Sequence, residues 1–182
     1  MVEDPDEDLV RAIGRGDARA MRRLVERKLP RLLALARRML ADAGEAEDVA
    51  QEAFLRIWRN AATWKAGSAR FDTWIHRVAM NLCYDRLRRR AVRTESEHAQ
   101  EPPLALEAER DDPAEERRSR VEGALQAIAP RQREALVLVY YQELSNIEAA
   151  AAMGVSVDAL ESLLARGRRA LHAILIRDRD ND

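Results

Sequence analysis

The residues that most often carry out covalent chemistry are few and widely spaced in this chain. Its three histidines are His76, His98 and His172, and its one cysteine is Cys83. This spacing matches no zinc-binding pattern, and one cysteine cannot form an intramolecular disulfide. The sequence also contains neither a phosphate-binding P-loop nor the G-x-S-x-G motif of hydrolases. We therefore expect a protein that is not an enzyme, with no catalytic residues, no metal, no cofactor and no small-molecule substrate.

Carboxylates are plentiful, and their spacing offers a different chemistry, the binding of a protein partner. Asp48, Gln51 and Glu52 stand at positions i, i+3 and i+4, so a helix presents them on one face. By spacing alone this face is either a solvated polar surface or a docking surface. The adjacent acids Glu47 and Asp48 do not indicate a nuclease or nucleotide hydrolase, because charge at a helix start explains them.

The charge of the chain is unevenly distributed, although its net charge is only −1. Residues 86–93 contain five arginines and no acid, and residues 163–177 contain four arginines and no acid. Between them, residues 94–116 carry nine acids and a single arginine. Two basic segments separated by an acidic one are typical of a protein that contacts nucleic acid at two places.

Composition predicts an all-α protein, since Ala, Leu and Arg favour helices and only 4% of the residues are aromatic. Apolar residues recur at helical spacing over the first half of the chain. They predict a short helix around Leu9–Ile13, a second capped by Asp17, a third after the turn at 42–48 and a fourth over about 72–93. Pro30 predicts a kink or break in the second helix. Trp58 and Trp74 fall on apolar faces and are expected in the core.

Residues 94–113 change character, with three prolines and an acidic excess, and predict a flexible linker. A second helical unit follows from about residue 114. One helix is expected over 119–128, and Pro130 suits the first turn of the next. The core candidates of that helix are Leu136, Val137, Val139, Tyr140 and Tyr141.

The pattern after residue 144 predicts a helix-turn-helix. Ser145 and Glu148 fit the S-x-x-E capping box, Gly154 supplies the turn, and Ser156 caps a longer helix. A short bracing helix followed by a longer one is the arrangement that places a recognition helix in the major groove. The alternative is an ordinary αα-hairpin, and the arginines late in the second helix favour DNA, because they can neutralise phosphates.

Three segments together resemble a known family. APRQREALVLVYYQELSNIEAAAAMGVSVDALESLLARGRRAL is similar to region 4, the C-terminal domain of the bacterial extracytoplasmic-function sigma factors. GEAEDVAQEAFLRIWR resembles the helix that docks on RNA polymerase, and FDTWIHRVAMNLCYDRLRRR resembles the helix that meets the minus-ten promoter element. The resemblance implies region 2 over residues 1–93, an acidic linker over 94–113 and region 4 over 114–182.

The resemblance implies a role for each matched position. The face of Asp48, Gln51 and Glu52 matches the surface that contacts the coiled coil of the largest polymerase subunit. The loop 63–70 and the basic helix after it match the part that handles the melted strand. The matched minus-ten residues are Trp64, Lys65, Arg70, Asn81, Asp85, Arg88 and Arg89. For Trp64, stacking on a base competes with a place in the core.

In the second domain, the resemblance matches Ser156, Glu161, Ser162, Ala165, Arg166, Arg168 and Arg169 to the minus-thirty-five element. Here the chain departs from the family pattern. Relatives often have Lys or Arg at the position of Glu161 and Arg at that of Leu163. A glutamate can accept a hydrogen bond from cytosine but is repelled by phosphates. Either the promoter preference differs, or Glu161 contacts protein.

The resemblance also implies partners: core RNA polymerase, promoter DNA as duplex and as melted strand, and an anti-sigma factor, which is often membrane-attached. We expect a cytoplasmic protein, because the acidic start differs from a signal peptide and no apolar run approaches a membrane span of roughly 20 residues. The acidic linker is a hypothetical nucleic-acid mimic in a basic polymerase channel. A redox role for Cys83 competes with a simple buried thiol. A dimeric helix-turn-helix regulator and a non-transcriptional adaptor are the remaining alternatives.

Overall fold

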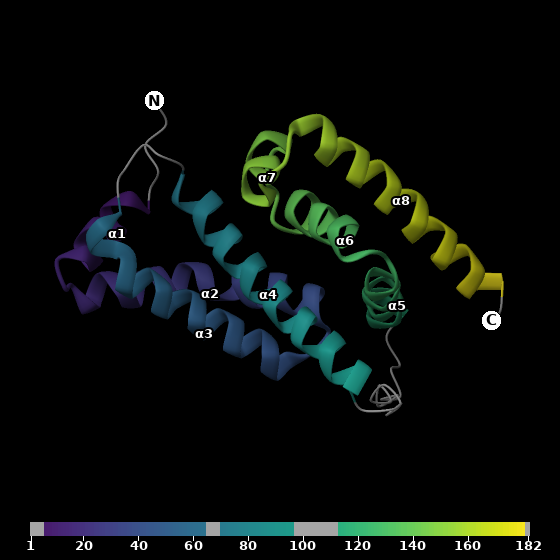
Figure 1. Ribbon diagram of the computed structural model, residues 1–182, viewed down its shortest axis with the longest axis horizontal. Helices are drawn as coiled ribbons and strands as arrows, with labels where there is room; N and C mark the ends of the chain where they lie inside the picture. The colour runs from purple at the N-terminus through teal and green to yellow at the C-terminus, as the bar shows by residue number, and fades with distance from the viewer. Residues whose placement is uncertain (1–5, 65–69, 97–112, 181–182) are drawn as a thin grey trace.

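The computed structural model describes residues 6–64, 70–96 and 113–180, and all regular structure in these ranges is helical. This confirms the all-α prediction. Figure 1 shows an N-terminal unit and a C-terminal unit lying side by side. The N-terminal unit comprises α1 (Glu7–Gly14), α2 (Ala18–Leu40), α3 (Ala43–Asn60), the short η1 (Ala61–Thr63) and α4 (Phe71–Ser96). The C-terminal unit comprises α5 (Pro113–Ala127), α6 (Pro130–Leu136), the π-turn η2 (Val137–Tyr141), α7 (Asn146–Met153) and α8 (Val157–Asp180).

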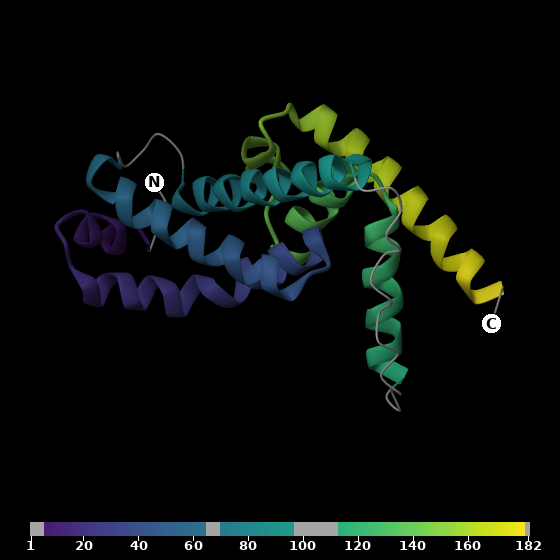
Figure 2. The same ribbon diagram turned by 60° about the horizontal axis from the view of Figure 1, so that its bottom comes forward.

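Helices α2 and α3 begin at side-chain caps. The Asp17 carboxylate accepts from the backbone N–H groups of residues 19 and 20 at 2.8 and 3.2 Å, and Asp42 accepts from that of residue 45 at 2.8 Å. Each cap satisfies donors that a helix start leaves open. Of the kink or break predicted at Pro30, the break does not occur, since α2 is continuous from Ala18 to Leu40. Helices α2 and α3 lie side by side, with α4 packed across both (Figure 2).

Apolar side chains from all four helices close the core of the first unit. Leu24, Leu35, Ile57, Phe71 and Ile75 are fully buried, and each such side chain stabilises the fold by roughly 1.5–3 kcal/mol. The residue before α1 forms ion pairs that join α1 to α2 and α4. The buried Asp6 carboxylate pairs with Lys28 of α2, and Lys28 also bonds Asp72 at the start of α4.

The core of the second unit is smaller than its sequence predicts. Leu136 and Val137 are buried as expected, but Tyr140 is 53% exposed and Tyr141 36% exposed. The π-turn is the reason, because it inserts a residue and rotates the two rings outward. There the Arg38 guanidinium lies 4.1 Å from the ring centroid of Tyr141.

The helix ends differ from the predicted linker boundaries. Helix α4 runs on to Ser96, and α5 begins already at Pro113. The rest of the predicted acidic linker lies outside the described residues.

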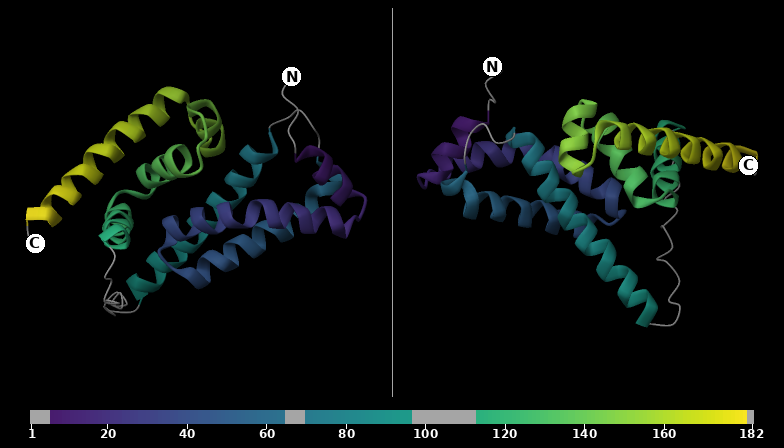
Figure 3. Two further views of the ribbon diagram at one scale, coloured as in Figure 1. Left: turned by 180° about the vertical axis from the view of Figure 1, so that it is seen from behind. Right: turned by 45° about the horizontal axis from the view of Figure 1, so that its top comes forward.

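The two units contact one another through helices that are far apart in sequence. Helix α4 packs against α7, and α2 packs against α5, α6 and η2. Figure 3 shows α4 running between the N-terminal bundle and the helix-turn-helix, while α8 lies on the far side of the second unit. This packing decides which of the predicted binding residues are exposed to solvent and which contact the other unit.

Candidate functional site

The predicted docking residues lie on the outer face of α3. Asp48, Gln51 and Glu52 line one side of a groove of about 380 Å³ between α3 and α4. The other lining residues are Arg56, Leu82, Asp85, Arg86 and Arg89. The sequence indicates neither the groove nor the pairing of Arg86 with Asp48, although Arg86 belongs to the basic segment 86–93.

Opposite charges face each other across and along this groove. Arg86 lies 3.7 Å from the Asp48 carboxylate, and the Arg56 guanidinium donates to Glu52 at 3.2 Å. The Asp48 side chain is 67% exposed, so its ion pair contributes at most about 1 kcal/mol. A partner's cation can therefore replace Arg86 at little cost.

Two large apolar side chains extend this face beyond the groove. Leu55 is 42% exposed and Trp58 is 45% exposed, one and two turns after Gln51. The expectation that Trp58 lies in the core is wrong. The inner face of α3 is filled by Phe54 and Ile57, and the helical rotation from Ile57 to Trp58 turns the indole outward. Because Trp58 and Leu55 continue the face of Gln51, the helical period could have found them.

The structure divides the predicted minus-ten residues into two groups. Asp85, Arg88 and Arg89 lie late in α4 and line the groove region next to α3. Arg70 precedes the first residue of α4. Along a helix with a rise of 1.5 Å per residue, it is about 27 Å from Arg88. Asn81 is exposed between them. One nucleotide cannot touch both groups, so any melted strand that uses all of them must follow the length of α4.

Trp64 occupies an aromatic cluster. Its ring centroid lies 5.7 Å from that of Phe71 and 5.3 Å from that of Trp74, both in edge contacts. Trp64 and Trp74 are half-buried and packed on the core, which favours the core alternative for Trp64. Lys65, the neighbouring predicted residue, lies outside the described residues.

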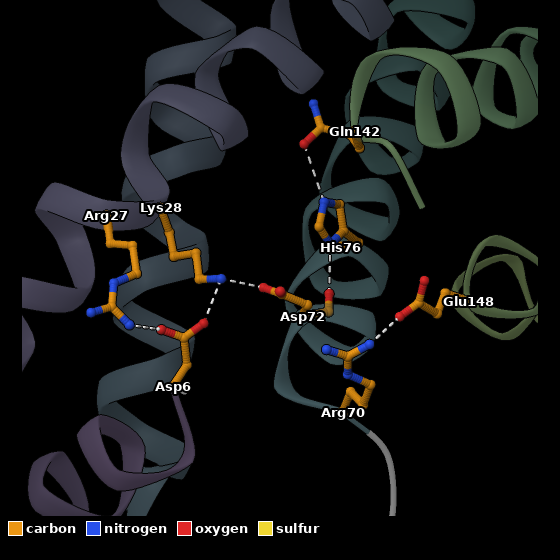
Figure 4. Close-up of polar contacts among 8 residues, drawn as sticks. All are labelled: Asp6, Arg27, Lys28, Arg70, Asp72, His76, Gln142 and Glu148. Carbon is orange, nitrogen blue, oxygen red and sulfur yellow. Dashed lines mark hydrogen bonds and ion pairs between the residues drawn. The ribbon is translucent and has the colours of Figure 1, made fainter. Parts of the chain in front are cut away.

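Arg70 and Arg77 join α4 to the first helix of the helix-turn-helix (Figure 4 shows Arg70). The Arg70 guanidinium lies 2.5 Å from the Glu148 carboxylate. Arg77 donates to the carbonyl oxygens of Ala151 and Ala152 at 2.5 and 3.3 Å. These carbonyls belong to the last turn of α7, where a helix leaves acceptors unpaired and favours a cation. Arg70, one of the predicted minus-ten residues, therefore pairs with a residue of the C-terminal unit.

A second contact between the units is buried and polar. The Arg133 guanidinium donates to the Met39 carbonyl of α2 at 2.6 Å and also bonds the side chain of Gln126. Burial lowers the pKa of Arg133. Nearby, the Tyr84 hydroxyl of α4 donates to the buried Glu134 carboxylate at 2.7 Å. Burial raises the pKa of Glu134 and of Tyr84. Both contacts place α6 against the first unit.

The helix-turn-helix has the predicted geometry. Ser145 and Glu148 form a complete capping box, with the Ser145 N–H donating to the Glu148 carboxylate at 3.0 Å. These bonds, followed by the charge of Arg70, lower the pKa of Glu148. Gly154 ends α7 with φ 66°, a left-handed conformation that glycine adopts without strain. Ser156 then caps α8 by accepting from the N–H of residue 159 at 3.1 Å.

The predicted recognition residues lie on the outer side of α8. Most are exposed, and Ala165 is half-buried. Glu161 accepts a hydrogen bond from Asn146, the first residue of α7, at 3.4 Å. Arg168 donates to the Tyr140 hydroxyl at 3.1 Å. Sequence reasoning missed Asn146, because its contact depends on the angle between the two helices. The exposed residues of the set are Ser156, Glu161, Ser162, Arg166, Arg168 and Arg169.

Within the described ranges, no group of three or more His, Cys, Asp or Glu side chains is placed to hold a metal ion. No helix in those ranges is long and apolar enough to span a bilayer.

Family models match both units in order. Residues 24–93 match sigma-70 region 2, and residues 118–171 match sigma-70 region 4. A region 2 unit followed by a region 4 unit with a helix-turn-helix defines the class of sigma-70-type transcription initiation factors.

Similar proteins narrow the class. The chain is 32% identical to the RNA polymerase sigma-H factor of Pseudomonas aeruginosa, covering 96% of each chain. It is 32% identical to the ECF RNA polymerase sigma factor SigE of Mycolicibacterium smegmatis, covering 96% of this chain and 70% of SigE. The structure of CnrH in complex with the cytosolic domain of CnrY matches with a TM-score of 0.73 and 28% identity, over 95% of this chain and 98% of CnrH. The chain belongs to the extracytoplasmic-function (ECF) family of RNA polymerase sigma factors. It binds core RNA polymerase and directs initiation at specific promoters.

Proposed function

We propose that the outer face of α3 is the surface by which this sigma factor docks on core polymerase. Asp48, Gln51 and Glu52 supply exchangeable polar and charged contacts, and Leu55 and Trp58 supply an apolar anchor beside them. Exposed aromatic side chains with a charged rim are typical of the residues that dominate binding energy. The exposure of Trp58 is the observation that carries this proposal, because folding alone does not require it.

The C-terminal unit reads the upstream promoter element as duplex. Helix α7 braces α8, whose exposed N-terminal half enters the major groove. Glu161 and Ser162 face base edges, while Arg166, Arg168 and Arg169 neutralise phosphates. The Arg168 guanidinium donates a hydrogen bond to the Tyr140 hydroxyl, which limits the positions that this side chain can take.

The N-terminal unit binds the minus-ten element along α4, from the loop before it to its arginine-rich end. Binding to a melted strand favours the open state, because the duplex offers no such contact. Arg70 joins this surface only after it leaves Glu148, so the two units must separate before the whole surface is available. Polymerase then fixes their spacing, and the two promoter contacts reinforce one another.

An anti-sigma factor controls this step. A solved protein of the same fold, the sigma factor RpoE of Bartonella quintana, is in complex with the anti-sigma factor NepR. It matches with a TM-score of 0.66 and 24% identity, over 85% of this chain and 95% of the solved chain. The exposed apolar side chains of α3 offer a target that an inhibitor can cover in competition with polymerase. We assign the protein to the cytoplasm and to a stress or envelope response, without a catalytic group of its own.

Reconstitution with core polymerase tests the proposal. Purified chain and core enzyme are supplied with fragmented genomic DNA, and the start sites of the transcripts are sequenced. A shared pair of upstream and minus-ten elements supports the function. The variant Trp58→Ala should lose initiation through weaker core binding, while the control Ile176→Ala, which removes a similarly exposed apolar side chain from α8, should keep it.

The alternatives give different results. Tight and specific binding of the free chain to duplex DNA indicates an operator-binding regulator. Core binding without transcription from any promoter indicates an adaptor.

A further inference from the structure

Glu161 stands in an unusual position for a DNA-facing helix, because it places a negative charge where phosphates are near. It lies in the second turn of α8, is exposed, and belongs to the half of the recognition helix that meets base edges. A carboxylate is repelled by phosphates and accepts hydrogen bonds only. At this position it therefore costs affinity for DNA in general, and any gain in DNA binding must come from a specific donor on a base.

The Glu161 carboxylate has one long, exposed hydrogen bond, from a side chain of α7, and still has acceptor capacity. Asn146 donates from its side-chain amide to one carboxylate oxygen of Glu161 at 3.4 Å. Asn146 is the first residue of α7, whose start is fixed by the capping box of Ser145 and Glu148. In the described part of the chain no lysine or arginine pairs with Glu161, and the nearby Arg166 instead donates to the Ser162 carbonyl at 3.2 Å.

The base edges of the major groove offer few partners for an oriented acceptor. Guanine presents two acceptors there, thymine an acceptor and a methyl group, and adenine a donor beside an acceptor. Cytosine presents its amino group as a donor, and Glu or Asp accepting from that group is an established pairing. A carboxylate that faces the groove floor in the bound state therefore pairs best with cytosine. Guanine and thymine offer it no donor, and adenine places the acceptor N7 beside its amino group.

We propose that Glu161, positioned by Asn146, is a specificity-determining residue that reads one cytosine of the upstream promoter element. This inference rests on the proposed role of α8 as the upstream-element helix. It assigns Glu161 to base reading, rather than to a protein contact or a solvated helix surface. Asn146 is a positioning residue and acts through the orientation of the carboxylate.

A promoter library tests the proposal with the whole holoenzyme. Core polymerase and full-length protein transcribe a library randomised over the upstream element, and the transcribed sequences are counted. The wild type should prefer cytosine by about tenfold or more at one position, the range of a single base contact. Glu161→Gln should shift that position towards adenine, because glutamine pairs with the adenine edge. Asn146→Ala should weaken the same preference and change no other position.

Two controls separate base reading from general binding. Arg169→Ala should lower transcription of all sequences to a similar extent, as expected for a phosphate contact. A promoter with pyrimidin-2-one in place of the selected cytosine lacks only the amino group. Transcription from this promoter should fall about tenfold with the wild type and little with Glu161→Ala.

The outcomes are distinct. If the wild type initiates from defined promoters but has no cytosine-selective position, or if Glu161→Gln leaves that position unchanged, the inference is overturned and the function stands. A uniform loss with Glu161→Gln also overturns it and indicates a protein contact. If no promoter is transcribed at all, the proposed function fails, and the inference fails with it.

Discussion

The side-chain amide of Gln142 joins the two units of the molecule through the ring of His76. Its carbonyl oxygen lies 3.2 Å from Nε2 of His76 on α4, while its amide nitrogen donates to the Arg31 carbonyl of α2 at 3.3 Å. Gln142 is only 2% exposed. It reaches this place because the π-turn ends with a bond from its own N–H to the Val137 carbonyl, five residues back, at 3.0 Å.

Replacing Gln142 by Ala should both destabilise and open the molecule. The change leaves the His76 nitrogen and the Arg31 carbonyl without this partner in a buried place, which costs about 1–3 kcal/mol. We expect a lower Tm and a larger radius of gyration by small-angle X-ray scattering. Glu143→Ala is the matched control, since its pair with Arg31 at 3.3 Å is exposed. A Gln142→Ala variant as compact as the wild type would contradict a role in holding the units together.

Glu148 should make stability depend on pH. Its pKa is lowered from 4.5, first by the Ser145 hydroxyl and N–H and then by Arg70. A lowered acid pKa stabilises the folded state above the ordinary value, and this contribution is lost as the pH falls through the folded pKa. Glu148→Gln should therefore reduce the free energy of unfolding by about 1 kcal/mol at pH 7.

Urea unfolding at a series of pH values measures this difference. The gap between wild type and Glu148→Gln should narrow as the pH is lowered below 4.5. Glu122→Gln, at an exposed position of α5, should differ little from the wild type at any pH. A gap that stays constant down to acid pH would show that the charge of Glu148 is not what stabilises the cap.

Local sequence signals predicted the fold well where one residue decides the structure. The capping box of Ser145 and the turn at Gly154 are formed as expected, because each acts within a few residues. Of the kink or break that Pro30 predicts, the break does not occur, because α2 is continuous through Pro30. The outward rings of Tyr140 and Tyr141 depend on a π-turn, for which the sequence carries no signal of comparable strength.

The sites were less predictable than the fold, because they depend on angles between helices. The face of Asp48, Gln51 and Glu52 follows from helical spacing alone. The engagement of Arg70 by Glu148 does not, since it joins residues that are 78 positions apart through the packing of two units. The orientation of Glu161 by Asn146 likewise requires the angle within the helix-turn-helix.

Gly14 and Gly123 should respond to alanine in opposite directions. A Cβ atom at Gly14 would lie 2.8 Å from the carbonyl oxygen of Ala61, a backbone atom that cannot move aside. Gly14→Ala should destabilise by roughly 1–3 kcal/mol. At Gly123, inside α5, a Cβ meets nothing within 4 Å, so Gly123→Ala should stabilise by about 0.5–1 kcal/mol. Thermal unfolding of both variants checks the prediction, and equal signs would contradict the close contact of α1 with η1.

Replacing Trp58 should affect the binding of core polymerase, whereas replacing Trp74 should affect the stability of the fold. Trp58→Ala should change the free energy of unfolding by less than about 1 kcal/mol but weaken core polymerase binding by about tenfold or more. Trp74 contacts Trp64 and Phe71, so Trp74→Ala should destabilise by about 2 kcal/mol or more. Calorimetry and a core-binding titration measure the two effects. A Trp58→Ala variant that binds as tightly as the wild type would remove the apolar anchor from the docking surface.

Cys83 should be unreactive in the folded protein. The thiol is fully buried, and burial raises its pKa to about 12, so almost none is thiolate at neutral pH. We expect Ellman's reagent to label it only as fast as the protein unfolds, and to label it at once in urea. Cys83→Ala should keep both core binding and its insensitivity to peroxide. Rapid labelling of the native protein, or a loss of core binding after mild oxidation that Cys83→Ala abolishes, would instead establish Cys83 as a redox sensor.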